Sequence, residues 1–151
     1  MKALVTALAL LGAGGVWAWA LTGAPPAAGL PEKYVGTYEM FRFAAGAVVG
    51  AVDPLAQGQS WKYTFRADGS YTIRVLVTAD WEMMRRTGTI REDGADALVL
   101  ARVAENGTPL DAPPERYYAQ WGSDEEGPYL HLTEELATRA GQQLFLRRIA
   151  D

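Results

Sequence analysis

The sequence predicts an all-β fold, an eight-stranded antiparallel up-and-down barrel with one short helix, preceded by an N-terminal signal or anchor helix. Two observations lead to this prediction. From Lys33 onward, apolar residues alternate with polar ones, which is the period of a strand with one buried face. Asp68-Gly69, Asp93-Gly94 and Asn106-Gly107 punctuate the alternating runs, and such pairs favour tight hairpin turns. The pattern therefore indicates a meander of short antiparallel strands.

Composition limits the class of protein. The chain has 151 residues, a formal net charge of −4, 49% hydrophobic residues and no cysteine. This length fits one domain preceded by a targeting segment, and five Trp, seven Tyr and four Phe are enough to form a packed core. The excess of 18 Asp and Glu over 14 Lys and Arg predicts no nucleic-acid partner. Without cysteine there is no disulfide, thiolate nucleophile or lipid-modified cysteine.

Residues 1–20 have the pattern of an export signal. Lys2 is the one charge before Glu32, an apolar run follows it, and Ala18-Trp19-Ala20 offers small residues for cleavage. The uncharged stretch is also long enough to cross a bilayer at about 1.5 Å per residue. We therefore expect a signal peptide cleaved after Ala20 or, as the alternative, an uncleaved membrane anchor formed by residues 3–20. Both place the remainder in the periplasm or cell envelope, secreted or anchored.

A linker and the folded domain follow this segment. Residues 21–31 are rich in Pro, Gly and Ala and carry no charge, which is the composition of an extended linker. Residues 32–151 form the predicted barrel domain. A domain of about 120 residues without disulfides is stabilised by its core alone, so we expect a compact architecture.

The predicted strands follow from the alternating runs in order. They are residues 34–43, 61–66, 71–78, 84–91, 97–103, 116–121, 128–132 and 143–149. A sheet of this length has two exposed edges unless it closes, and eight strands enclose room for side chains or one small ligand. A sandwich of two sheets is the alternative, because local periodicity does not distinguish it from a barrel. Trp81–Arg86 fits both phases of the alternation, and a bulge at Gly88 would join them.

Two segments interrupt the strand pattern. Thr133–Ala140 is predicted as the short helix, because Thr133 suits its N-cap and Gly141 follows its end. Ala44–Val52 has no polar side chain, and Asp53-Pro54 ends it. We interpret this apolar segment as a lid over the open end of the barrel or as a helix packed there permanently.

The order of several short motifs resembles a known family. Gly36-Thr37-Tyr38, the run Tyr63–Thr72, Thr87–Ile90 before an Asp-Gly turn, and the closing Leu144–Arg148 together resemble the small bacterial lipocalin-like domains of the calycin type. The resemblance covers residues 32–151 and implies a barrel that binds a small apolar or amphipathic molecule. It also implies that Tyr38, which stands where the family has Trp, packs against Arg147 or Arg148, since a guanidinium can stack on a Tyr face.

Aromatic residues in phase with the expected inner face are the candidate ligand contacts. A wall of rings with a few polar groups suits an amphipathic ligand. The candidates, with the single histidine in phase with Tyr129, are Tyr38, Trp61, Tyr63, Phe65, Tyr71, Trp81, Tyr117, Trp121 and His131. A core filled by these same side chains is the alternative interpretation, because a barrel of this size is just filled by side chains.

The sequence favours binding over catalysis. It contains no Gly-x-Ser-x-Gly, phosphate loop or His-Glu-x-x-His, so we expect no catalytic residue, cofactor or metal. A small isomerase or hydrolase that uses His131 is a further alternative.

Two adjacent pairs of arginines, Arg85-Arg86 and Arg147-Arg148, could bind an anionic head group at the barrel rim. The alternative is that they pair with carboxylates on the outer face, because the alternation of a strand places one residue of each pair outside.

The function predicted from the sequence is an exported cell-envelope barrel that binds a small hydrophobic or amphipathic ligand without catalysis. The main alternative is a structural or interaction module with a filled barrel and an envelope protein as its partner.

Overall fold

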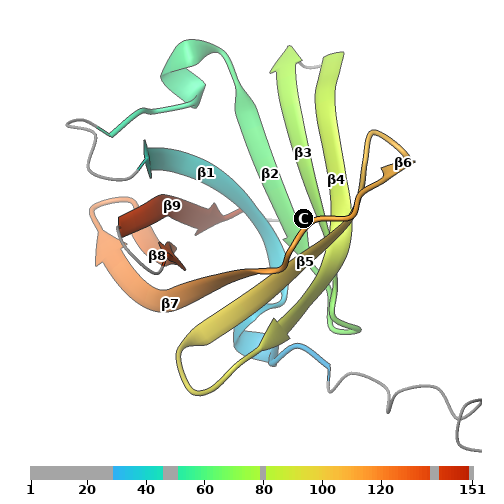
Figure 1. Cartoon of the computed structure of the whole chain (residues 1–151). Coiled ribbons are helices and arrows are strands. Elements are labelled where there is room, and N and C mark those ends of the chain that lie inside the picture. The colour runs from blue at the N-terminus through green and yellow to red at the C-terminus, as the bar shows by residue number, and fades with distance from the viewer. Residues whose placement is uncertain (1–28, 46–50, 79–80, 137–139, 150–151) are drawn as a thin grey trace, which may run out of the picture.

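The computed structural model describes residues 29–45, 51–78, 81–136 and 140–149 (Figure 1). Two single-turn 3-10 helices, η1 (Glu32–Tyr34) and η2 (Leu55–Gln57), accompany the strands. The strands are β1 (Gly36–Ala45), β2 (Ser60–Phe65), β3 (Ser70–Thr78), β4 (Trp81–Glu92), β5 (Ala97–Glu105), β6 (Thr108–Pro109), β7 (Glu115–Asp124), β8 (Gly127–Glu135) and β9 (Ala140–Arg148).

The long strands close into a barrel. The sheet order is β4-β3-β2-β1-β9-β8-β7-β5-β6, and an additional pairing joins β4 to β5. Each long strand therefore has an antiparallel partner on both sides, and β6 only extends the hairpin that follows β5. The predicted eight-stranded up-and-down barrel is confirmed, because a sandwich would leave strand edges unpaired.

The short helix predicted at Thr133–Ala140 is wrong. Thr133 lies within β8 and pairs with Tyr118 of β7 and with Gln143 of β9. Strand β9 starts at Ala140, and residues 137–139 lie outside the described ranges. The backbone hydrogen bonds that β8 forms with two neighbours outweigh the weak local preference of a capping residue and two glutamates.

The signal or anchor helix predicted at residues 1–20 lies outside the described residues. In the part of the chain that is described, none of the helices has the length and apolarity that a membrane crossing needs. Leu30, the second described residue, is buried against the barrel, and its backbone N–H donates to the Ala67 carbonyl at 3.1 Å.

The barrel has a closed end, where β1 begins beside η1, and an open end, where β1 ends. The inward side chains of the closed half pack into a continuous core that Tyr34 and Leu30 complete. Those with no more than 2% of their surface exposed include Tyr38, Phe65, Ile90, Leu98, Leu130, Leu132 and Leu146. Large, nearly fully buried side chains thus pack against one another in this half.

Arg148 joins the first and last strands at the closed end. Its Nη2 donates to the carbonyl oxygens of Lys33, at 3.1 Å, and Val35, at 2.9 Å, and to the Tyr38 hydroxyl at 3.0 Å. The guanidinium carbon lies 5.4 Å from the centre of the Tyr38 ring. The contact that the resemblance implies is therefore present with Arg148. Arg147 faces outward and pairs with Asp124.

Gly88 of β4 lies opposite a bulge in β5, where Val103 is the extra residue. The inner phase of β4 runs unchanged through Arg86, Gly88 and Ile90, so the prediction that a bulge at Gly88 joins two phases is wrong, and the extra residue within β4 is Met83. The register between β4 and β5 shifts between Thr87 and Gly88. A Cβ atom at Gly88 would lie 2.1 Å from the Ala101 carbonyl oxygen and 2.7 Å from the Tyr71 ring. Glycine at this position therefore allows the Tyr71 ring to lie flat against β4 on the inner face.

We expect Arg148→Met to lower the free energy of unfolding by about 1–3 kcal/mol, because the buried Tyr38 hydroxyl and the more exposed carbonyl oxygens of Lys33 and Val35 lose a charged donor. Urea denaturation measures this change. The matched control is Arg91→Met, because Arg91 is exposed on β4 and pairs with Asp93 at 3.1 Å, and we expect a change within about 0.5 kcal/mol. Equal effects of the two variants would show that Arg148 does not fasten the closed end.

Candidate functional site

The open half of the barrel encloses a cavity of about 230 Å³. Inward side chains of β1 to β5, β7 and β9 line it, so the closure of the sheet creates it. The lining residues are Met40, Phe43, Trp61, Tyr63, Tyr71, Ile73, Arg86, Leu100, Arg102, Glu115, Tyr117, Gln142 and Leu144. The volume lies just below the ~300–1,000 Å³ of sites for drug-sized molecules, so this cavity suits a small ligand.

Six of the nine predicted contact residues lie inside the barrel. Trp61, Tyr63, Tyr71 and Tyr117 line the cavity. Tyr38 and Phe65 are buried in the closed half and belong to its solid core. The predicted inner phase of the aromatic strands therefore holds, but part of the set fills the core.

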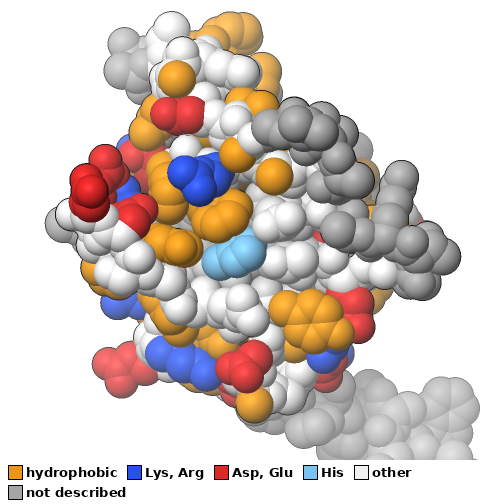
Figure 2. Space-filling view, turned by 90° about the vertical axis from the view of Figure 1, so that its left-hand side faces the viewer, with side chains coloured by type: hydrophobic (Ala, Val, Ile, Leu, Met, Phe, Trp, Pro, Cys, Tyr) orange, Lys and Arg blue, Asp and Glu red, His pale blue; other side chains and the backbone are white. Residues whose placement is uncertain are grey.

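The other three predicted residues lie away from the cavity. Trp81 is 58% exposed at the start of β4, and Trp121 is 46% exposed and stacks on the Tyr34 ring at 6.5 Å. His131 lies on the outer wall of the barrel, near the centre of the face in Figure 2. Its Nε2 lies 3.1 Å from the Gln143 Oε1, and its ring stacks on Phe145 with 4.2 Å between ring centres.

Two arginines and a glutamate in the cavity were not among the predicted contact residues. Arg102 pairs with Glu115, and Glu115 also accepts a hydrogen bond from the Tyr117 hydroxyl at 3.1 Å. The Nε of Arg86 donates to Glu105 at 2.5 Å. The alternation that buries Leu98 and Leu100 continues to residue 102, and this signal places Arg102 inside.

The Arg85-Arg86 pair divides between the two faces of β4, as alternation predicts. Arg85 lies outside, where its Nε donates to Glu82 at 2.7 Å, whereas Arg86 lines the cavity. The outer arginine thus has the carboxylate partner expected of a surface charge. The inner arginine contributes its charge to the barrel interior.

The cavity tyrosines are protonated at neutral pH, and burial raises their pKa further above the ordinary value of about 10. Desolvation raises the pKa of Tyr63, Tyr71 and Tyr117, while the positive charges of the cavity arginines act in the opposite direction. Their hydroxyl groups are therefore hydrogen-bond donors at neutral pH. The Tyr63 hydroxyl contacts Met40 Sδ at 4.0 Å, and a thioether is a weak acceptor, so this donor is available to a ligand.

A second, mostly apolar pocket of about 290 Å³ adjoins the cavity beneath the connection from β1 to β2. Met40, Phe43 and Trp61 line both spaces, and Val52, Pro54, Gln57 and Gln59 complete the second. Two backbone hydrogen bonds, of 2.8 and 2.7 Å, fasten Val52 to Phe43. The predicted lid, Ala44–Val52, starts within β1 and ends at this contact, and its residues 46–50 lie outside the described ranges.

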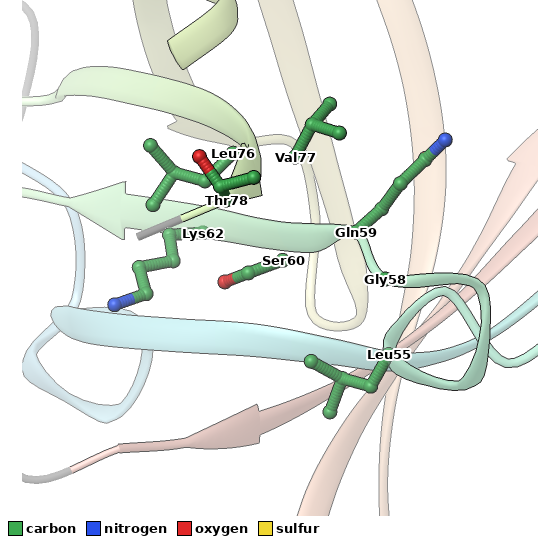
Figure 3. Close-up of a pocket in the computed structure, with 8 residues that line it drawn as sticks. All are labelled: Leu55, Gly58, Gln59, Ser60, Lys62, Leu76, Val77 and Thr78. Atoms are coloured by element: carbon green, nitrogen blue, oxygen red, sulfur yellow. The ribbon is translucent and has the colours of Figure 1, made fainter. Parts of the chain in front are cut away.

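A third hollow of about 440 Å³ lies beside the same connection on the outer side of β2 and β3 (Figure 3). Lys62 and Ser60 point to one side of β2, whereas Gln59, just before β2, and Val77 of β3 point to the other side. The Ser60 hydroxyl already donates to Glu39 at 2.6 Å. With one lysine and no converging polar groups, this groove is a weaker site than the barrel cavity.

The cavity combines polar and apolar lining groups. Guanidinium and phenol groups supply donors, and Trp61, Phe43 and the aliphatic residues supply an apolar wall. Over the described residues, no group of three or more His, Cys, Asp or Glu side chains is arranged to hold a metal ion.

Comparison with protein-family models, curated proteins and solved structures finds no match. The architecture nevertheless defines a class: a closed, eight-stranded antiparallel β-barrel, consistent with the lipocalin-like barrel fold.

We expect the free energy of unfolding to fall as the pH rises above about 10, the ordinary tyrosine pKa. The unfolded chain loses its phenolic protons there, whereas the folded barrel retains those of Tyr63, Tyr71 and Tyr117 because their pKa is raised. The folded state then binds more protons than the unfolded state, so stability falls with rising pH.

Urea unfolding from about pH 8 to about pH 12 measures this slope. Tyr63→Phe removes one such proton and should reduce the slope by up to about 1.4 kcal/mol per pH unit. An unchanged slope in this variant would contradict the assignment to buried tyrosines.

Proposed function

We propose that this protein is an exported, non-catalytic member of the lipocalin-like barrels that binds a small hydrophobic or amphipathic molecule in the bacterial cell envelope. The single observation that carries the proposal is the cavity of about 230 Å³ in the open half of the barrel. A barrel of this size is either filled by side chains or holds one small ligand, and here the closed half is filled and the open half is not.

The cavity lining favours an amphipathic rather than a purely apolar ligand. Trp61, Phe43 and Leu144 offer an apolar wall, while Arg86 and Arg102 add charge to the same space. Ligand sites typically combine an apolar wall with a few placed polar groups that fix the orientation of the ligand. A purely apolar ligand would offer no acceptor to the arginine and tyrosine donors that are not already bonded to Glu105 and Glu115.

Membership in the lipocalin-like family and export have separate support. The contact of Arg148 with the Tyr38 ring, at 5.4 Å, is the closed-end arrangement that the family resemblance implies. The proposal of export depends on residues 1–20, whose basic start, apolar run and Ala-x-Ala ending are typical of a signal peptide.

One observation favours the alternative of a protein-interaction module. Phe41, Tyr129 and Phe145 form an aromatic cluster on the outer wall, with ring centres 5.6 to 6.2 Å apart. Arg147 covers the Phe41 ring at 4.3 Å, and His131 stacks on Phe145 with 4.2 Å between ring centres. Half-buried aromatic residues of this kind are frequent in protein interfaces.

We expect Ile73→Trp to abolish the uptake of an apolar fluorescent probe, because Ile73 lines the cavity and a larger side chain fills it. Probe fluorescence is titrated against the protein, and circular dichroism checks that the barrel is folded. Arg74→Trp is the matched control, because the neighbouring side chain faces outward and pairs with Glu82.

Leu144→Phe is a milder filling variant that is available if Ile73→Trp does not fold. Probe binding that survives filling of the cavity would place the ligand elsewhere and overturn the proposal.

Native mass spectrometry of the protein purified from its own envelope fraction, in mild detergent, tests export and cargo together. We expect a mass that begins at Leu21 and carries an added small lipid-like species. A chain that retains residues 1–20 would indicate the anchor in place of the signal peptide. A protein without cargo that also takes up no probe would favour the interaction module.

A further inference from the structure

We propose that the open end of the barrel docks on the surface of a phospholipid bilayer through exposed apolar side chains around its mouth. The inference concerns this outer edge and not the cavity, so it goes beyond the proposed function and is tested separately from it. We call the set of side chains the apolar rim. Its members, each at least 37% exposed, are Val52, Leu55, Trp81, Met83, Val103 and Leu110.

The apolar rim lies at one pole of the barrel. Because β1 runs toward the open end and neighbouring strands are antiparallel, the open-end connections join β1 to β2, β3 to β4, β5 to β7 and β8 to β9. Val52 and Leu55 lie in the first connection, and the other rim residues lie near the open ends of β4 and β5 or just after β6. Leu136, just after β8, adds an exposed apolar side chain at the fourth connection. Among the described residues, the other exposed large apolar side chains are Tyr118 and Trp121 of β7.

Backbone hydrogen bonds hold parts of the rim in place. The Asp53 Oδ1 accepts the N–H of Leu55 at 2.9 Å and that of Ala56 at 3.2 Å, and these bonds shape the single turn of η2 that presents Leu55. The N–H of Leu110 donates to the Val103 carbonyl oxygen at 2.9 Å, which keeps two rim residues beside each other. Because this apolar surface is ordered before contact, docking loses little conformational entropy.

The closed end is charged where the open end is apolar. The turns that join β2 to β3, β4 to β5 and β7 to β8 contain five carboxylates and one guanidinium, from Arg66, Asp68, Asp93, Asp96, Glu125 and Glu126. Lipid phosphates repel a surface with such an excess of negative charge. The sequence of the open-end connections contains three aspartates and one arginine. Contact with a bilayer is therefore favoured at the rim, by burial of apolar side chains and not by charge attraction.

A bilayer fits the rim better than a second copy of the chain does. In a two-fold symmetric dimer the same surface meets itself, so Asp53 and Asp111 of one copy would approach those of the other and repel them. The rim residues also come from separate segments around an opening and do not form one strand face. The interfacial region of a bilayer accepts such separate side chains, and tryptophan in particular is enriched there.

The rim is continuous with the apolar inner surface of the barrel. Val52 is exposed at the rim and also lines the pocket of about 290 Å³. Phe43 and Trp61 line this pocket and the barrel cavity as well. A bilayer in contact with the rim would therefore cover a path of apolar side chains that leads from its surface into the barrel.

Sedimentation with sucrose-loaded phosphatidylcholine vesicles tests the proposal. The protein is expressed from the full sequence and used as the cell produces it, and it is held in a lipid nanodisc where it retains residues 1–20. We expect sedimentation with the vesicles at low and at high sodium chloride alike, because salt screens charges and not apolar contacts. Leu55→Gln/Trp81→Gln should lower the vesicle partition coefficient at least about tenfold, which is the effect of losing the burial of one large apolar side chain.

Trp121→Gln is the matched control. Trp121 is 46% exposed, close to the 58% of Trp81, but it lies at the closed end, where it stacks on the Tyr34 ring. Its replacement should leave the partition coefficient unchanged. Circular dichroism checks that each variant is folded, and Met83→Gln/Leu110→Gln is the second rim variant if the first does not fold.

Four outcomes would overturn the inference. They are no sedimentation of the unchanged protein, equal sedimentation of the rim variant, equal losses in the rim variant and the Trp121 control, and binding that disappears at high salt. Native mass spectrometry without vesicles tests the second copy, and a dimer that the rim variant abolishes would replace the bilayer as the occupant. We expect the rim variant to take up the apolar fluorescent probe as the unchanged protein does, so a failure of docking is distinguishable from a failure of the cavity.

Discussion

The pairing of β1 with β9 is the constraint on which the rest of the structure depends. It joins the first and last strands of the meander, so each long strand that the structure describes has a neighbour on both sides. The same closure turns one face of each strand into the interior. The solid core, the cavity and the inward arginines all follow from this one set of backbone hydrogen bonds.

The interior is divided into two halves by residue size and polarity. At the closed end, tyrosine, phenylalanine and leucine side chains meet from all sides, and Arg148 fastens the first strand to the last. Toward the open end, the lining changes to arginine, glutamate and glutamine among the aromatic residues. Charged side chains need water or partners, so they keep the space around them open, whereas apolar side chains close it.

The sequence predicted the barrel and its strands because period two and Asp-Gly turns are local signals, whereas the closed-end contact was implied by the family resemblance. It did not predict that Thr133 lies in a strand. A capping residue indicates only a local preference for a helix, whereas the pairing of β8 with β7 and β9 is a long-range effect. Inward phase was right for Tyr63 and Tyr71, but phase alone does not tell a packed ring from one that lines a cavity. Arg86 and Arg102 were missed as contacts because a charged side chain is ordinarily assigned to the outer face, although the alternation through Leu98 and Leu100 places Arg102 inside.

Both ends of the folded domain lie at the closed end. The chain enters at Leu30, beside Ala67, and leaves at Ile149, whose N–H donates to Thr37 at 2.9 Å. Any tether formed by the N-terminal segment therefore attaches to the base of the barrel, and the mouth lies at the opposite pole. An anchored copy would present its mouth away from its own membrane, and would exchange its cargo with the aqueous space or with a facing surface rather than with the lipids that hold it.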